Sequence, residues 1–256
     1  MTDDLTTFYD GLAEDYHLVY ADWEASIERQ AEALHRVIAD VLGPGPKRIL
    51  DGSCGIGTQS LGLARRGHDV LGVDLSPAAV ERARKEAASR GLTIDVRVGD
   101  LRELETVTSE RYDVVLSCDN SLPHLLTDAD LRRGVRSMLG RVRPGGLLLA
   151  SIRDYDDILR TRPVTTPPAF SGPRGSRRLT FQIWDWDVDG RRYELELFVM
   201  KERGPDDWRV RSHRARYRAL TRAELKEVLE YAGASAVEWR VPAETGFFQP
   251  LVTGRP

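Results

Sequence analysis

The sequence lacks the features that mark several classes of protein. Its only cysteines, Cys54 and Cys118, are too few for a disulfide framework or a cysteine-rich zinc site, and we expect no bound metal. No apolar run approaches the roughly 20 residues that a membrane-spanning helix needs, so we expect no membrane association. The formal net charge is only −3, which gives no global electrostatic reason to expect a nucleic-acid partner.

The beginning of the chain also lacks the basic and apolar regions of a signal peptide, because it reads Met1-Thr2-Asp3-Asp4. The 256 residues are 41% hydrophobic and 30% charged, which is typical of a soluble globular protein. This length is enough for one large α/β domain with a lid. A cytoplasmic protein is therefore the simplest interpretation.

Residues 1–45 are predicted to form an N-terminal helical arm. Apolar residues recur at helical spacing between Leu5 and Leu42, and the sequence Gly43-Pro44-Gly45-Pro46 ends the pattern. The first half of this arm is dense in aromatic residues: Phe8, Tyr9, Tyr16, Tyr20 and Trp23. We expect most of them to pack the arm onto the main domain, and one or two could close over a bound ligand.

Residues 46–256 are predicted to form a Rossmann-like α/β domain with a doubly wound, mostly parallel sheet. Strand patterns at 48–51, 69–74, 93–98, 112–117 and 147–152 alternate with helical patterns at 58–66, 77–90 and 128–141. Such alternation is typical of parallel strands joined by crossover helices. Ligands of these sheets bind beyond the carboxyl ends of the strands.

The pattern changes after Arg153, where residues 160–219 are predicted to form an inserted antiparallel β lid. Residues 161–178, rich in Pro, Gly, Ser and Arg, suggest a mobile loop. Alternating segments follow at 179–187, 192–201 and 208–219, with turns at Asp189-Gly190 and Gly204-Pro205-Asp206. Thr221 and Glu224 then form a predicted capping box for a helix that ends at Gly233, and final strands are expected at 236–241 and 247–252.

Four polar features fall where predicted parallel strands end: the loop from Asp51 to Gly57, then Asp74, Asp100, and Cys118-Asp119-Asn120. A glycine-rich turn before a helix lets backbone N–H groups approach a ligand closely. An acid at the end of the second strand can accept both hydroxyls of a ribose, and one after the third strand can accept an adenine amine. Each acid also has a local structural interpretation, as a helix cap or a turn, but the set favours a nucleotide-containing ligand.

These motifs resemble those of the class I S-adenosylmethionine-dependent methyltransferases. The resemblance implies S-adenosyl-L-methionine as the cofactor, with S-adenosyl-L-homocysteine as product. In that family the glycine-rich loop supports the methionine part, the second acid holds the ribose and the third holds the adenine. Ser53 stands where the family commonly has its first glycine. The implied cofactor-binding residues are Trp23, Asp51, Ser53, Gly55, Gly57, Asp74, Leu75, Asp100, Leu101 and Cys118.

Three further segments resemble the glycine and sarcosine N-methyltransferases: Asp22-Trp23, Asn120-Ser121-Leu122-Pro123-His124-Leu125 and Arg153-Asp154-Tyr155-Asp156. The resemblance implies methylation of the amine of a small amino acid. Arg153 then binds the carboxylate, which suits a bidentate guanidinium. Asp154 replaces an asparagine of the family pattern, and its charge could instead favour a cationic substrate. The implied catalytic residues are Asn120, His124, Arg153 and Tyr16.

The reaction requires little chemistry from the protein, because a sulfonium methyl is already activated and an amine lone pair can attack it in line. Holding the reacting groups collinear is the main contribution. A catalytic base is therefore not compulsory. Asp119, His124 and the N-terminal tyrosines are the candidates to position or deprotonate the acceptor. For Cys118 and for the remaining histidines, His17, His35, His68 and His213, we favour structural roles.

Three alternatives remain open at this point. An O- or C-methyltransferase of a specialised metabolite would suit the 161–178 loop and the nearby tryptophans. An RNA methyltransferase could use the arginines between 209 and 218, although pairing with Glu194, Glu196 and Glu202 on the preceding strand is the interpretation that we favour. The chain could also be a non-catalytic cofactor-binding subunit. We expect a small-molecule partner and no nucleic acid, and self-association into a homo-oligomer is compatible with the sequence.

Overall fold

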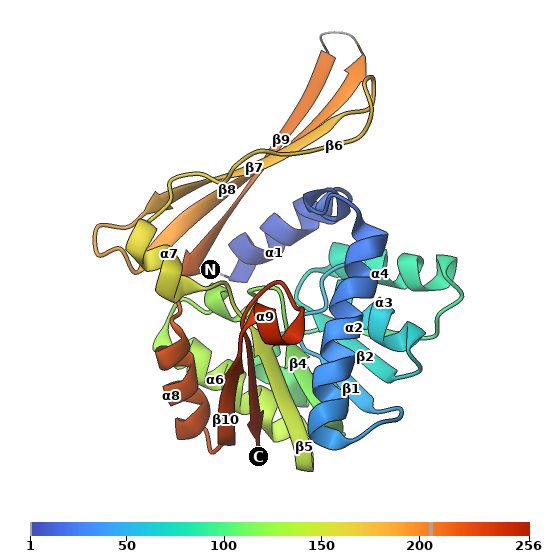
Figure 1. The fold of residues 1–256 in the computed structure, drawn as a ribbon, viewed down its shortest axis with the longest axis vertical. Helices are drawn as coiled ribbons and strands as arrows, with labels where there is room; N and C mark the ends of the chain where they lie inside the picture. The colour runs from blue at the N-terminus through green and yellow to red at the C-terminus, as the bar shows by residue number, and fades with distance from the viewer. Residues whose placement is uncertain (1, 205–206) are drawn as a thin grey trace.

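The computed structural model describes residues 2–204 and 207–256, so most of the predicted turn at Gly204-Pro205-Asp206 lies outside the described residues. Its main sheet has seven strands in the order β10-β11-β5-β4-β1-β2-β3 (Figure 1). The strands are β1 (Arg48–Asp51), β2 (Asp69–Asp74), β3 (Asp95–Val98), β4 (Tyr112–Ser117), β5 (Val142–Ser151), β10 (Ser235–Arg240) and β11 (Leu251–Arg255). Strand β11 runs antiparallel to both of its neighbours. The predicted doubly wound, mostly parallel sheet is confirmed.

Helices cover both faces of this sheet because its central strands are apolar on both sides. Ile49 of β1 packs in a cluster with residues of α2 (Trp23–Leu42) and α3 (Thr58–Arg65). The adjacent Leu50 packs in another cluster with residues of α5 (Leu104–Val107), α6 (Asp128–Arg141) and α8 (Arg222–Tyr231). Helix α4 (Pro77–Ser89) shares a third cluster with Trp23 and Ile56. These helices cover the faces of the sheet and not the carboxyl ends of its strands, where the site can form.

Two predicted helix starts are confirmed by their caps. The Ser76 side chain accepts a hydrogen bond from the Ala79 amide and begins α4 just before Pro77. Thr221 and Glu224 form the capping box of α8. None of the described helices is long and apolar enough to cross a membrane.

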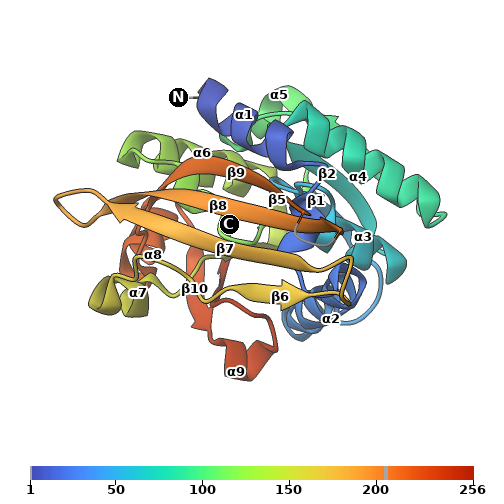
Figure 2. The same ribbon diagram turned by 90° about the horizontal axis from the view of Figure 1, so that it is seen from above.

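A second sheet of four antiparallel strands lies across the carboxyl ends of the parallel strands (Figures 1 and 2). It consists of β6 (Ala169–Ser171), β7 (Arg178–Trp186), β8 (Arg192–Gly204) and β9 (Asp207–Arg218). We call it the lid sheet. Part of the predicted 161–178 loop is instead the strand β6, because Phe170 pairs with Leu179 of β7. The helix α7 (Tyr155–Thr161) connects the two sheets.

The N-terminal segment divides into α1 (Thr2–Leu12), a 3₁₀ turn η1 (Tyr16–Val19) and the long helix α2. Helix α1 lies under the lid sheet, whereas α2 packs on α3 of the main domain (Figure 1). Two predicted strand starts are wrong by four residues or more. Strand β11 begins at Leu251 rather than at 247, because Phe247 is a buried core residue after the short helix α9 (Pro242–Thr245). Strand β5 begins at Val142 rather than at 147 and includes an irregular pairing with β4.

Candidate active site

Two adjoining cavities lie between the lid sheet and the ends of the parallel strands. The larger cavity, of about 640 Å³, faces the loops that follow β1, β2, β3 and β4. The smaller cavity, of about 380 Å³, lies beside Asn120, Arg153 and Gln249. The residues that line both cavities are Phe8, Tyr9, Tyr16, Tyr20 and Asp119. The aromatic arm and one acid therefore form the boundary between the two cavities.

The glycine-rich loop is braced from behind by Asp51 at the end of β1. Its carboxylate accepts hydrogen bonds from the Ser60 hydroxyl, at 2.7 Å, and from the Ser53 amide, at 3.3 Å. Burial raises the pKa of the Asp51 carboxyl to about 7. Asp51 is not among the described residues that line either cavity. Its predicted cofactor role is therefore limited here to shaping the loop.

The two loop glycines serve different purposes. Gly55 lines the larger cavity with φ at +53°, and an added Cβ would point at the Tyr16 ring, 3.6 Å away. Gly57 has φ at +95° and begins α3; an added Cβ would lie 3.1 Å from the Leu61 side chain. Left-handed backbone at both positions favours glycine. Gly55 thus keeps the cavity open, whereas Gly57 allows the turn into α3 and does not line the cavity.

Ser53, which stands at the family's first glycine position, lines the larger cavity and is tied across the sheet. Its hydroxyl lies 2.8 Å from the hydroxyl of Ser117 at the end of β4. Cys118, the next residue, also lines this cavity, and burial raises the pKa of its thiol well above the usual value. The thiol is therefore protonated at neutral pH, as expected for an inert buried cysteine.

Asp74 faces the larger cavity from the end of β2, beside Leu75, which also lines it. The Asp74 carboxylate accepts hydrogen bonds from the Gly55 amide, at 2.8 Å, and from the Ser76 amide, at 2.9 Å. Burial raises the pKa of this carboxyl above its usual value. Asp74 therefore links the glycine-rich loop to the start of α4 and presents an acceptor to the cavity.

Asp100 and Leu101 form another wall of the larger cavity after β3. The Asp100 carboxylate accepts hydrogen bonds from the backbone amide of Arg102, at 2.8 Å, and from its guanidinium, at 2.6 Å. Burial alone would raise the pKa of Asp100, but its pairing with Arg102 lowers this pKa below the usual value. Leu101 packs over Gly52, where an added Cβ would come within 2.5 Å of the leucine side chain. Gly52 is thus a lining residue that the sequence analysis missed.

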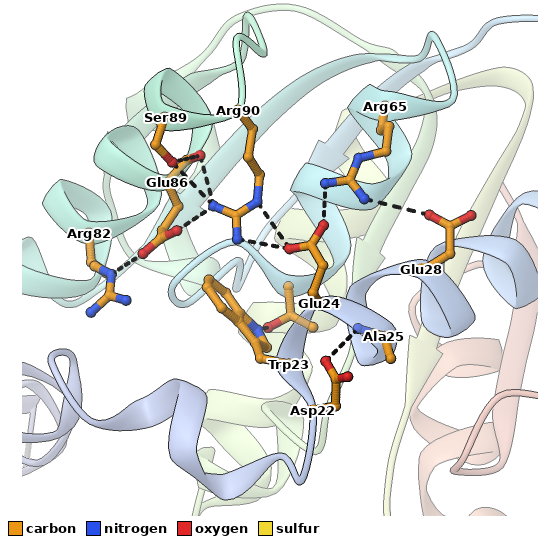
Figure 3. Close-up of polar contacts among 11 residues, drawn as sticks. Asp22, Trp23, Glu24, Ala25, Glu28, Arg65, Arg82, Glu86, Ser89 and Arg90 are labelled. Carbon is orange, nitrogen blue, oxygen red and sulfur yellow. Dashed lines mark hydrogen bonds and ion pairs between the residues drawn. The ribbon is translucent and has the colours of Figure 1, made fainter.

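Trp23 lines neither cavity among the described residues and instead supports the loop from outside. Its indole N–H donates to the Thr58 hydroxyl at the start of α3, at 2.9 Å. The Arg90 guanidinium lies over its ring, 5.2 Å from the centroid. Figure 3 shows the surrounding network, in which Glu24 pairs with Arg65 and Arg90. This network joins α2 to α3 and α4 behind the glycine-rich loop.

Arg153 lies in the smaller cavity with its charge surrounded by neutral groups. Its guanidinium donates to the Tyr193 hydroxyl, at 3.1 Å, and to the Gln182 side chain, at 3.4 Å. It also lies over the rings of Trp184 and Tyr217, with centroids at 4.9 and 5.5 Å. Within residues 2–204 and 207–256, no carboxylate forms an ion pair with Arg153. The arrangement presents a positive charge that can bind an anionic group.

Both polar atoms of the Asn120 side chain form hydrogen bonds within the protein and hold Arg153 in place. Its side-chain oxygen accepts a hydrogen bond from the Arg153 amide, at 3.0 Å, and its side-chain nitrogen donates to the Tyr155 hydroxyl, at 3.1 Å. Tyr155 lies 2.8 Å from the Tyr193 hydroxyl. The network Asn120–Tyr155–Tyr193–Arg153 is closed, so Asn120 lines the cavity mainly as a positioning residue.

His124 lines the larger cavity with both ring nitrogens engaged. Its Nδ1 lies 3.1 Å from the Arg216 carbonyl oxygen and its Nε2 lies 2.8 Å from the Tyr9 hydroxyl. Since a carbonyl only accepts, Nδ1 carries the proton and Nε2 accepts from Tyr9. Burial lowers the pKa of His124 to about 3. His124 is therefore a neutral imidazole that orients Tyr9.

The arginines of β9 are largely paired with carboxylates. Arg214 pairs across the sheet with Glu196, at 3.2 Å, as the favoured interpretation predicted. Arg216 pairs with Asp187, at 2.9 Å, and Arg218 with Asp128, at 2.8 Å. The pairing expected for Glu202 is wrong in detail, because Glu202 pairs with Arg177 before β7. These pairs reduce the basic character that an RNA-binding strand would need.

Residues 49–146 match a family model described as a methyltransferase domain. The glycine/sarcosine N-methyltransferase of Parasynechococcus marenigrum (strain WH8102) is 28% identical over 138 residues, which are 54% of this chain and 48% of that protein. The chain spans about half the length of the curated relatives that match it first. Residues 49–146 thus form a methyltransferase domain.

Solved structures extend the likeness of the fold to nearly the whole chain. An S-adenosylmethionine-dependent methyltransferase from Clostridium acetobutylicum ATCC 824 has a TM-score of 0.75 at 15% identity and covers 96% of this chain and 97% of its own. CalS10, an amino pentose methyltransferase from Micromonospora echinaspora, has a TM-score of 0.72 at 21% identity, covering 90% of this chain and 92% of its own. At these identities the likeness shows a shared fold over nearly the whole chain.

Sequence reasoning missed several residues of the smaller cavity and its surroundings, namely Gln182, Tyr193, Tyr217 and Gln249. Three of them lie on lid strands and one precedes β11, far along the chain from Arg153. No local motif marks them. The period-two alternation of β7, β8 and β9 could have indicated which lid residues face inward, but not what they contact.

Proposed function

We propose that this protein transfers a methyl group from S-adenosylmethionine to the amine of a small molecule that also carries a carboxylate, such as glycine, sarcosine or a related amino acid. The observation that carries this proposal is the Arg153 guanidinium, which faces the smaller cavity without an ion-pair partner among the described residues. A half-buried cation of this kind favours an anionic partner, and a carboxylate matches the paired N–H donors of a guanidinium.

The residues of the larger cavity fit S-adenosylmethionine. Gly55 leaves open the space that a Cβ would fill, Asp74 offers an acceptor for a ribose diol, and Asp100 with Leu101 offers a polar edge and an apolar face for adenine. When bound, the cofactor supplies an activated sulfonium methyl group. The chain then has to orient the acceptor at the boundary between the cavities and exclude water, which Tyr9, Tyr16 and Tyr20 are placed to do.

The names of similar proteins support an amine as the acceptor. Glycine and sarcosine in one relative, and an amino pentose in one structural neighbour, both present an amine. An amino sugar is therefore the second candidate, and the volume of about 380 Å³ favours an acceptor larger than glycine. The role proposed for Arg153 distinguishes amino acids from amino sugars, because an amino sugar offers hydroxyls but no carboxylate for the guanidinium to bind.

The test combines an acceptor panel with one substitution. The purified protein, supplied with S-adenosylmethionine, is expected to release S-adenosylhomocysteine with amino acids, and product mass identifies the methylated atom. Arg153→Met should raise the KM for these acceptors about 10- to 100-fold, the value of one charge-assisted hydrogen-bonded pair, and leave carboxylate-free amines unaffected. Arg160→Met, which changes an exposed arginine of α7, is the matched control.

Several outcomes contradict the proposal. Release of S-adenosylhomocysteine with phenols but with no amine would favour O-methylation. Turnover of amino sugars that is unchanged by Arg153→Met would favour the second candidate. Tight binding of S-adenosylhomocysteine without turnover of any acceptor would support a non-catalytic cofactor-binding protein.

A further inference from the structure

We propose that Asp119 binds the acceptor as its ammonium ion and takes the proton that must leave before methyl transfer. The proposal rests on the proposed function, in that the acceptor is an amine. It goes beyond that function by assigning a catalytic residue. It also requires that the acceptor enters as a cation, so the enzyme selects a protonated nitrogen over neutral hydroxyl groups.

The position of Asp119 carries the argument. It is one of five residues that line both cavities, and the other four are aromatic. Its carboxylate accepts hydrogen bonds from the Tyr20 hydroxyl, at 2.9 Å, and from the Gln249 side chain, at 3.5 Å. Within the described parts of the chain, no arginine, lysine or histidine forms an ion pair with it. A negative charge held only by neutral donors therefore lies where the acceptor nitrogen has to meet the methyl group.

The backbone at Asp119 and at the following residue is conformationally strained. Asp119 and Asn120 have φ at +58° and +67°, the left-handed region in which glycine is the least strained residue. Ser151 holds this conformation, since its hydroxyl accepts from the Asp119 amide, at 2.8 Å, and donates to Gln249, at 2.7 Å. Gln249 in turn donates to the Asp119 carboxylate. Backbone strain that is retained by such a ring of contacts is typical of functional sites.

The other titratable groups at the boundary are less suited to accept a proton. The free lone pair of His124 already accepts from Tyr9, and burial lowers its pKa to about 3. Burial raises the pKa values of Tyr9, Tyr16 and Tyr20 well above their usual value, so all three remain protonated. Burial raises the pKa of Asp119 above its ordinary value, although the Tyr20 hydrogen bond and the charge of nearby Arg153 act to lower it. Its carboxylate is therefore a stronger base than an exposed one. Asp119 is thus the remaining candidate.

An ammonium nitrogen has no lone pair, so one N–H bond breaks and its proton passes to a carboxylate oxygen of Asp119, leaving a neutral amine. The freed lone pair forms the new N–C bond with the methyl carbon while the C–S bond breaks and its electron pair stays on sulfur. The product leaves as an N-methylammonium ion. Asp119, now a carboxylic acid, returns its proton to solvent and is ready for another turnover.

The test uses Asp119→Asn and a matched pair of acceptors: an amine that is protonated at the assay pH, and a fluorinated analogue whose low pKa leaves it neutral. For the protonated amine, kcat/KM should fall about 100-fold or more, as expected for loss of a general base. For the neutral analogue the fall should be much smaller. In the variant, the rising limb of the pH profile for the protonated amine should also move to higher pH, following the pKa of the amine itself.

Two controls separate chemistry from structure. S-adenosylhomocysteine affinity, measured by calorimetry, reports whether the variant still folds and binds the cofactor product. Asp189→Asn, at the exposed turn between β7 and β8, is the matched control substitution. An equal loss for both acceptors, or an unchanged pH profile, overturns the assignment to Asp119 while the proposed function stands. A wild-type protein that methylates no amine overturns both.

Discussion

The larger and the smaller cavity are built from different parts of the chain. The larger cavity lies on loops that follow β1, β2, β3 and β4, so its polar residues come from consecutive strand ends. The smaller cavity joins the N-terminal arm, the segment at Arg153, three lid strands and Gln249. The proposed cofactor site is thus supplied by the sheet itself, whereas the proposed acceptor site lies where the lid can vary without disturbing the sheet.

The two cavities also differ in how their charges are compensated. In the larger cavity, Asp74 accepts from two backbone amides and Asp100 pairs with Arg102. In the smaller cavity, Arg153 and Asp119 have only neutral hydrogen-bond partners among the described residues. Opposite charges without partners suit an acceptor that brings both an ammonium and a carboxylate. The contrast leads to three predictions.

The largest effect is expected from Asp74→Ala, which should disable the larger cavity alone. The change removes the acceptor proposed for the ribose and leaves the Gly55 and Ser76 amides without their partner. We expect S-adenosylhomocysteine affinity to fall about 100- to 1,000-fold, since two or three hydrogen bonds at 1–3 kcal/mol each are lost. Calorimetric titration measures it, with circular dichroism to confirm the fold. Affinity within threefold of the wild type would show that Asp74 is not part of the cofactor site.

An intermediate effect is expected from Asp15→Asn, at the connection between arm and lid. The buried Asp15 carboxylate pairs with Lys201 of β8 and with Arg211 of β9, the latter at 3.3 Å. Loss of its charge should cost roughly 1–3 kcal/mol of unfolding free energy, as for other charge-assisted hydrogen bonds. Because the arm and the lid form most of the smaller cavity, the acceptor KM should rise more than the cofactor KM. Equal increases in both would contradict the proposed division between the cavities.

The smallest effect concerns His68, which lies away from both cavities. It accepts from the Lys47 amide, at 3.1 Å, and lies 3.0 Å from His35; burial lowers its pKa to about 4. Because the unfolded state binds a proton near pH 6.5, stability should be complete above that pH and fall as the pH approaches 4. We expect a loss of about 1 kcal/mol between pH 7.5 and 5.5, measured by urea unfolding. His68→Asn should reduce this pH dependence without changing the acceptor preference.

Much of the fold and of the larger cavity could be predicted, because the signals are local. Apolar runs such as 114–116 identify buried strands, and Ser76 with Pro77 identifies a helix start. Asp74 and Asp100 follow their strands directly, so their place at one edge of the sheet follows from parallel pairing. Gly52 has no comparable local signal, because its importance depends on Leu101 lying over it.

The smaller cavity could be predicted only in part. Arg153 and Asn120 stand in motifs, but Asn120 turns out to hold Arg153 and Tyr155 through its side chain. Trp23, expected at the cofactor, instead donates to Thr58 behind the loop. The strand β6 and the late start of β11 were missed because pairing with a neighbouring strand of the sheet, rather than local propensity, decides where a short strand begins and ends.

The sequence by itself determined which segments form buried strands, where helices begin and which acids follow the strand ends. These depend on hydrophobic period and on residues a few positions apart. The tertiary structure alone decided that Asp119 faces both cavities, that His124 is neutral beside Tyr9, and that Arg153 lacks a carboxylate partner among the described residues. Burial and charge compensation arise from groups that are close in space and distant in sequence, and no local pattern encodes them.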